Sequence, residues 1–141
     1  MIVLTLDPGN STGWLLCEVF PDGAFKIISG GTLGENHPEV AQKIIDSSPS
    51  LVIYETFHMY PGKAASLAWN SFYPCEVIGV IKYICSTQNI VTCPLAPSTK
   101  KYAGGFKHPA WENFRSTHEY TEHTKDTWLL FQYWYRNKRK K

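Results

Sequence analysis

The sequence lacks any long apolar run: no stretch approaches the roughly 20 residues that a helix needs to cross a bilayer. Its first residues, MIVLTLD, contain an apolar segment too short for the core of a signal peptide, and no basic segment precedes it. We therefore expect a protein that stays in the cytoplasm and has no membrane partner.

Cysteine is also sparse, with four residues and no CxxC pair. Structural zinc sites need clustered thiolates, and disulfide-stabilised scaffolds usually contain more cysteine. We expect Cys17, Cys75, Cys85 and Cys93 to be free thiols that serve as small core residues, as in a reducing compartment.

The net charge is only +2 and does not identify a partner, but the basic residues are unevenly distributed. Five of the fourteen lysines and arginines lie within residues 136–141, and Lys100, Lys101 and Lys107 form a second cluster. Clustered basic residues suit a phosphate backbone, whose charge they neutralise. The C-terminal cluster is equally compatible with a solvated tail, so both interpretations of it stay open.

The overall hydrophobic and aromatic content suits one domain. Of the 141 residues, 43% are hydrophobic and 14% aromatic, which supports one core and leaves no room for two ordinary domains. We expect a single domain over residues 1–135, followed by a basic tail over residues 136–141.

The hydrophobic pattern predicts an α/β fold. Apolar runs at 2–6, 14–20 and 25–29, separated by turns that contain glycine, predict an antiparallel meander of three strands. Runs at 51–54 and 90–93 alternate with helical patterns, which indicates parallel strands joined through helices. The result is a mixed five-stranded sheet flanked by helices on both faces.

Helical patterns lie between and after these strands. They cover residues 38–47, residues 63–86 with an interruption, and a closing stretch from about 118 to 135 that contains no glycine or proline. Residues 94–109 are rich in proline and glycine, which predicts loops with one short helix at 98–102.

Two acidic residues, Asp7 and Glu55, directly follow apolar strands. If those strands are parallel neighbours, both carboxylates emerge at one edge of the sheet, where α/β proteins place their sites. Adjacent carboxylates repel one another, and a divalent cation relieves the repulsion. The pair indicates a metal site, although either acid alone would be an ordinary strand end.

The predicted closing helix adds His123 and Asp126, which share one helical face because they are three residues apart. Glu119 and Glu122 occupy neighbouring positions of the same predicted helix. The apolar, aromatic sequence beyond Asp126 must pack on the core and so carry the first turns to the sheet edge. Taken alone, these acids are better explained by the positive end of a helix, with His123 in solvent.

Three carboxylates and one imidazole thus form a candidate ligand set, consisting of Asp7, Glu55, His123 and Asp126. Oxygen ligands suit Mg²⁺, and the imidazole is also compatible with Mn²⁺. Two such ions about 4 Å apart hold a phosphodiester for in-line displacement, one activating water and the other stabilising the leaving 3′ oxygen. The set predicts a two-metal nuclease.

Three segments resemble the motifs of the RuvC-type Holliday-junction resolvases, a family of the RNase H-like superfamily. IVLTLDPGNSTGW resembles the first motif, LVIYETF the second acidic motif, and HTKDTWLL the last, in which an acid or histidine precedes the final Asp by three residues. The order and wide spacing of the segments also match, and the chain length is nearest to phage-encoded members.

The resemblance implies an RNase H-like fold and a structure-selective endodeoxyribonuclease. It implies that Holliday junctions are resolved by paired nicks that leave 5′-phosphate and 3′-hydroxyl ends. It places two Mg²⁺ or Mn²⁺ ions on the four catalytic and metal-ligating residues, Asp7, Glu55, His123 and Asp126. It also implies a homodimer, since the junction has near two-fold symmetry, and a location in the host cytoplasm if a phage encodes the chain.

The resemblance also assigns contacts to DNA. Lys100, Lys101 and Lys107 fall where the family places lysines near the scissile phosphate or the junction arms. Phe57 or His58 matches the aromatic side chain that inserts at the crossover.

Other protein classes share parts of this pattern. Actin-like ATPases also begin with a strand and Asp-x-Gly, but they need two such domains. An RNase H-like nuclease that acts on structured RNA would share the acidic cluster. A non-cleaving nucleic-acid-binding module would share the fold, although it has no reason to keep four metal ligands. An assay of four-way DNA against structured RNA separates these alternatives.

Overall fold

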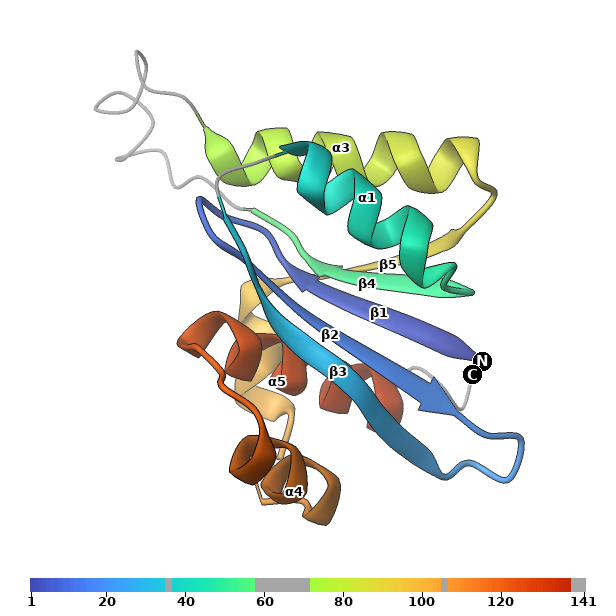
Figure 1. The fold of residues 1–141 in the computed structure, drawn as a ribbon, viewed down its shortest axis with the longest axis vertical. Coiled ribbons are helices and arrows are strands. Elements are labelled where there is room, and N and C mark those ends of the chain that lie inside the picture. The colour runs from blue at the N-terminus through green and yellow to red at the C-terminus, as the bar shows by residue number, and fades with distance from the viewer. Residues whose placement is uncertain (35–36, 58–71, 105–106, 138–141) are drawn as a thin grey trace.

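The computed structural model describes residues 1–34, 37–57, 72–104 and 107–137 (Figure 1). Its strands form one five-stranded sheet in the order β3-β2-β1-β4-β5. The elements in chain order are β1 (Ile2–Asp7), β2 (Thr12–Val19), β3 (Phe25–Leu33), α1 (His37–Ser47), β4 (Leu51–Glu55), α3 (Tyr73–Thr87), β5 (Val91–Leu95), η2 (Pro97–Tyr102, a 3₁₀ helix), α4 (Pro109–Thr117) and α5 (Glu122–Asn137).

The sheet is mixed, as the sequence predicts. β1, β2 and β3 pair antiparallel as a meander, while β4 pairs parallel with β1, and β5 pairs parallel with β4. Gly23, with a φ of 94°, lies in the turn between β2 and β3 and adopts a backbone conformation that other residues rarely take. The α/β fold with an antiparallel meander and parallel strands is therefore confirmed.

Helices cover both faces of the sheet: α1 and α3 lie on one face, and α5 lies on the other (Figure 1). Alternate residues of β1 point to opposite faces. Val3 and Ile53 pack with Trp128 of α5 in one apolar cluster, whereas Leu4 and Val52 pack with α1 and α3 in the second. β1 is thus buried on both sides, which explains its continuous apolar sequence.

Helix α4 occupies residues to which the sequence pattern assigns no element. His108 caps it, since His108 Nδ1 accepts a hydrogen bond from the backbone N–H of Ala110 at 3.1 Å. Pro109 supplies a fixed φ that suits a first helical turn. Trp111 and Phe114 are buried in the apolar cluster on the α5 side, so tertiary packing stabilises this short helix.

Helix α5 begins at Glu122, four residues later than predicted, and continues to Asn137 rather than ending at 135. At its start, the hydroxyls of Thr121 and Thr124 each accept a 3.4 Å hydrogen bond from the other residue's backbone N–H. Such reciprocal capping fixes the first turn of a helix. Most of the predicted tail, residues 138–141, lies outside the described residues.

None of the four cysteines, all of which the structure describes, forms a disulfide. Cys17 and Cys85 are buried, whereas Cys75 is exposed on α3, so its expected place in the core was wrong. Among the helices that the structure describes, none has both the length and the apolar character that a membrane span requires.

Candidate metal centre at the sheet edge

Strand register brings Asp7 and Glu55 together. β1 and β4 are parallel neighbours with Leu6 opposite Tyr54, so the next residue of each strand is an acid at the same edge. Asp7 lies four residues after Val3, and Glu55 lies two residues after Ile53. Because alternate strand residues share a face, both acids point to the α5 face, as Val3 and Ile53 do. The structure therefore places the two carboxylates as the sequence pattern suggests.

The first turns of α5 bring His123 and Asp126 to the same edge. Gly13 of β2 pairs with Asp7 in the sheet, and a Cβ on Gly13 would lie 2.4 Å from the His123 carbonyl oxygen. Only glycine permits this approach of helix to strand. As a result His123 Nδ1 reaches Asp7 Oδ2 at 3.1 Å, a contact in which the ring nitrogen donates to the carboxylate.

Hydrogen bonds to β3 hold this helix start in place. The Thr124 hydroxyl donates to the carbonyl oxygen of Gly31 at 3.2 Å, and the hydroxyls of Thr121 and Thr32 lie 2.7 Å apart. Sequence reasoning did not identify Gly13 or these threonines as part of the site. The only available signal was the Thr-Gly pair that ends the first motif.

Lys100 lies inside the acidic cluster. Its Nζ is 2.8 Å from Glu55 Oε2 and 3.0 Å from Asp126 Oδ2. Both contacts join the ammonium to a carboxylate, and the contact with Asp126 is also a hydrogen bond. The sequence predicted Lys100 as a contact to DNA and gave no sign of this position.

The cluster carries an excess of buried negative charge. Asp7 is only 8% exposed. The pKa of Asp7 is raised to about 6, chiefly by burial and also by the nearby carboxylates of Glu55 and Asp126, although the hydrogen bond from His123 acts in the opposite direction. For Lys100, burial lowers the pKa, but the two carboxylates outweigh burial and the net direction is upward.

The donor chemistry fits a hard divalent cation, because the cluster combines three carboxylates and one imidazole. The side chains are held in two groups, Asp7 with His123 and Glu55 with Asp126 around Lys100. Among the described residues, no three His, Cys, Asp or Glu side chains already stand where one metal ion could join them.

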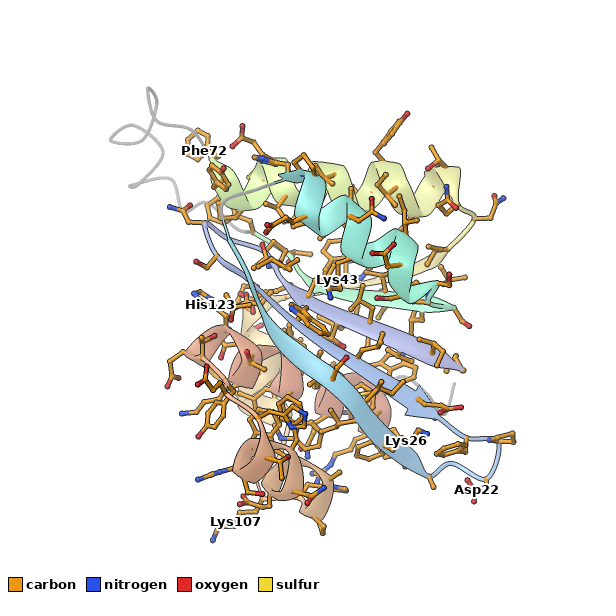
Figure 2. The ribbon with its side chains drawn as sticks, in the orientation of Figure 1. Asp22, Lys26, Lys43, Phe72, Lys107 and His123 are labelled. Atoms are coloured by element: carbon orange, nitrogen blue, oxygen red, sulfur yellow. The ribbon has the colours of Figure 1, made fainter. Side chains whose placement is uncertain are left out.

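The other predicted site residues lie apart from the cluster. Phe57 is partly exposed just beyond β4, and His58 lies outside the described residues. Lys101 is exposed on η2, beside Lys100 in sequence. Lys107 is exposed just before α4, far from His123 in Figure 2, so the three lysines do not form one patch.

Glu119 and Glu122 also lie outside the cluster. Glu119 is exposed in the segment before α5, so its predicted place on that helix was wrong. Glu122 is exposed and forms an ion pair with Lys125 at 2.9 Å. Neither acid is gathered with Asp7 and Glu55.

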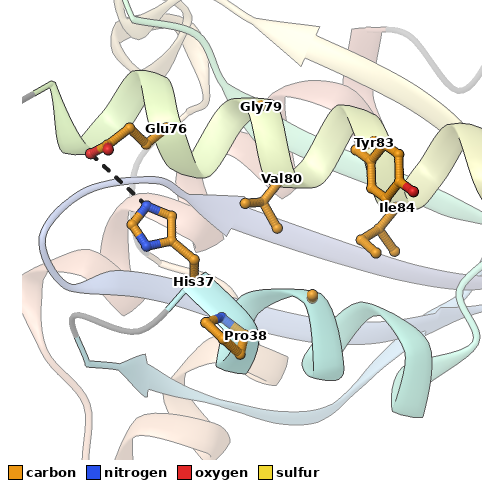
Figure 3. Close-up of a pocket in the computed structure, with 8 residues that line it drawn as sticks. His37, Pro38, Glu76, Gly79, Val80, Tyr83 and Ile84 are labelled. Atoms are coloured by element: carbon orange, nitrogen blue, oxygen red, sulfur yellow. Dashed lines mark ion pairs between the residues drawn. The ribbon is translucent and has the colours of Figure 1, made fainter.

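A hollow of about 710 Å³ lies between α1 and α3 (Figure 3), the helices on the opposite face of the sheet from α5. Its lining is mainly apolar, and its one close polar pair is His37 Nε2 and Glu76 Oε2, 4.0 Å apart. The hollow offers space for a ligand, but the carboxylates that could bind a metal lie on the α5 side of the sheet.

No protein-family model matches the chain, and no curated protein matches its sequence. Solved structures do match. RuvC of Thermus thermophilus, in complex with Holliday junction substrate, has a TM-score of 0.66 and 15% identity over 94% of this chain and 92% of its own. The fowlpox virus Holliday junction resolvase has a TM-score of 0.69 and 12% identity over 96% and 98%.

The yeast mitochondrial Holliday junction resolvase, Ydc2, has a TM-score of 0.62 and 14% identity, covering 95% of this chain and 77% of its own. At these identities the likeness shows the fold. It confirms the RNase H-like architecture of RuvC that the three sequence motifs imply.

Proposed function

We propose that this chain is a metal-dependent endonuclease that cleaves branched DNA. Its most specific activity would be resolution of Holliday junctions by paired nicks that leave 5′-phosphate and 3′-hydroxyl ends. The observation that carries the proposal is the convergence of Asp7, Glu55, Asp126 and His123 at one sheet edge. The fold supports it, since the solved structures with the same architecture are junction resolvases.

In this proposal Asp7, Glu55 and Asp126 hold two Mg²⁺ ions, or Mn²⁺, and His123 completes the ligand set. When bound, such ions supply an activated water and stabilise the leaving oxygen of a phosphodiester. Asp7 is the central ligand because it is the most buried of the acids and faces carboxylates from both β4 and α5.

His123 has a second task. Its Nδ1 is engaged by Asp7, so the ring is oriented and Nε2, on its other side, is the atom left for a ligand or a proton. The His123 side chain is 46% exposed, which gives substrate access to that nitrogen. Hence His123 would orient water or carry a proton at the mouth of the cluster.

The test uses a mobile four-way DNA junction beside fork, loop and duplex controls, each with Mg²⁺ or with a chelator. Paired symmetric nicks that require the metal support a resolvase; scattered cuts on all branched substrates indicate a general branch nuclease. Structured RNA in a parallel reaction tests the RNA-directed alternative. Binding of the junction without any cleavage would leave only the binding-module alternative.

We also propose a homodimer, because a junction with near two-fold symmetry needs two nicks in opposed strands. Light scattering coupled to size-exclusion chromatography measures this directly. DNA contacts are proposed for Phe57, beside the Glu55 edge, for Lys101, on the helix that holds Lys100, and for Lys107, whose separate position suits a junction arm. The proposed location is the cytoplasm.

A further inference from the structure

We propose that Lys100 is an internal counter-cation that competes with the metal for Glu55 and Asp126. This inference rests on the proposed metal-dependent function and adds a residue that sets the affinity of the site. The side chain bridges the two acids, one from β4 and one from α5, at 2.8 and 3.0 Å.

The backbone around Lys100 fixes it at this place. η2 directly follows β5, the neighbour of β4, and the N–H of Thr56 donates to the carbonyl oxygen of Leu95 at 2.8 Å, which ties the two strand ends together. The Thr99 hydroxyl donates to the carbonyl oxygen of Ala96 at 2.7 Å at the start of η2. Lys100 is therefore anchored beside Glu55.

A divalent cation that bound both Glu55 Oε2 and Asp126 Oδ2 would displace the Lys100 ammonium. Mg²⁺ ligands lie about 2.0–2.1 Å from the ion, closer than either Lys100 contact, so a cation bound by both oxygens would occupy the space of Nζ. Like charges so close repel strongly in a partly buried site. Lys100 must therefore leave these two oxygens before one ion can bind both of them.

Two consequences follow for the protein itself. Without metal, Lys100 balances part of the charge that otherwise destabilises the buried acids, because breaking a buried ion pair leaves an uncompensated charge. With metal, the free energy of removing Lys100 from its partners is subtracted from the binding free energy. Lys100 thus stabilises the empty centre and weakens its affinity for the ion.

The experiment compares the full-length wild type with Lys100→Met, which keeps the length of the side chain and removes the charge. Lys125→Met is the matched control, because Lys125 also pairs with a carboxylate, Glu122, but outside the cluster. Calorimetry measures the Kd for Mn²⁺, and thermal unfolding with and without Mg²⁺ gives an independent readout.

We expect Lys100→Met to bind Mn²⁺ roughly five-fold or more tightly, which is the usual scale of coupling between two ligands. Its Tm should fall without metal and rise further with Mg²⁺ than the wild-type Tm does. Lys125→Met should keep the wild-type Kd. An unchanged or weaker Mn²⁺ affinity in Lys100→Met would overturn the proposal.

If Lys100→Met does not fold, a second measurement, made on the wild type, still tests the proposal. In protein labelled at the lysine ε-carbon, the Lys100 signal, assigned through Lys100→Arg, should move to the position of a free lysine as Mg²⁺ is added. A Lys100 signal that stays fixed while Mg²⁺ binds contradicts the competition.

The two proposals fail differently. If the wild type binds Mn²⁺ and cleaves junctions while the two lysine tests show no change, only the role of Lys100 is wrong. If neither the wild type nor Lys100→Met binds a metal ion, the metal-dependent function and the competition are both wrong.

Discussion

The two faces of the sheet are packed with different kinds of side chain. Under α1 and α3 the buried residues are mainly aliphatic, such as Leu4, Ile44 and Ile81, and a hollow remains between the helices. Under α5 several aromatic residues join the aliphatic ones, and the rings of Trp111 and Trp128 stack with centroids 5.5 Å apart. Among the described residues, only the α5 face ends in a cluster of buried charge.

This difference indicates which face of the sheet offers groups that could bind a metal ion. A hollow lined by apolar side chains has room for atoms but offers few groups that bind or react. On the α5 face, strand register and a glycine contact bring four donor groups to one edge of the sheet. Pairs of substitutions, one on each face of the sheet, therefore test whether the function belongs to the α5 face.

The largest expected effect comes from Asp7→Asn, which keeps the shape of the side chain and removes a central charge. Junction cleavage should fall roughly a thousandfold, because metal-ion catalysis supplies several kcal/mol of transition-state stabilisation. Gel-based cleavage rates measure this, with junction binding expected to persist. Glu76→Gln, in the hollow on the opposite face, should leave the rate unchanged. Equal nicking by Asp7→Asn and the wild type would show that the assignment of the metal centre is wrong.

Gly13→Ala should reduce cleavage about a hundredfold, since a displacement of about 1 Å at a catalytic group can have that effect. The added Cβ would lie 2.4 Å from the His123 carbonyl oxygen and push the start of α5 away from β2. Its match on the other face is Gly79→Ala, where, apart from the chain neighbours and the nearby helix backbone, no described atom lies within 4 Å of the added carbon. Gly79→Ala should keep full activity and stabilise α3 by up to about 1 kcal/mol. Normal cleavage by Gly13→Ala would show that the close contact does not position His123.

A third effect concerns stability and pH in metal-free buffer. The pKa of Asp7 rises to about 6 in the folded protein, so the wild type loses stability as pH rises from about 4 to about 6. Asp7→Asn has no such ionisation. It should be more stable than the wild type above pH 6, by up to about 3 kcal/mol, and equal to it near pH 4. Urea unfolding across this range measures the difference, and a gain that does not depend on pH would rule out the ionisation of Asp7 as its cause.

The smallest effect concerns the exposed cations. Lys101→Ala should weaken junction binding modestly and reduce the slope of log affinity against log salt by about one. Lys43→Ala is the match on α1, where Lys43 Nζ lies 3.8 Å from the centroid of the Trp14 ring. It should leave the slope unchanged. If both variants show the wild-type slope, Lys101 does not contact the DNA.

The sheet and the paired acids could be predicted because their signals are local. An apolar run that ends in Asp7 or Glu55 records both the strand and the place where its carboxylate emerges. Helix α4 could not be predicted, because its cap is a histidine and its stability comes from rings buried against distant residues.

The position of Lys100 was also beyond sequence reasoning. Its neighbours Lys101 and Lys107 suggested a shared basic surface, but one lysine turns inward to two acids that the fold brings to it. The helix of His123 and Asp126 was recognised, although its start depends on Gly13 and on threonine contacts to β3. Charge clusters in a sequence do not show which member will face inward.

The contact between His123 and Asp7 joins residues that lie 116 positions apart in the chain. During synthesis, β1 to β5 leave the ribosome before α5, because the chain is made from its N-terminus. A nascent chain at that stage would hold Asp7 and Glu55 but neither donor from α5. The proposed metal centre would therefore be completed late, when translation has carried α5 far enough to dock on the sheet.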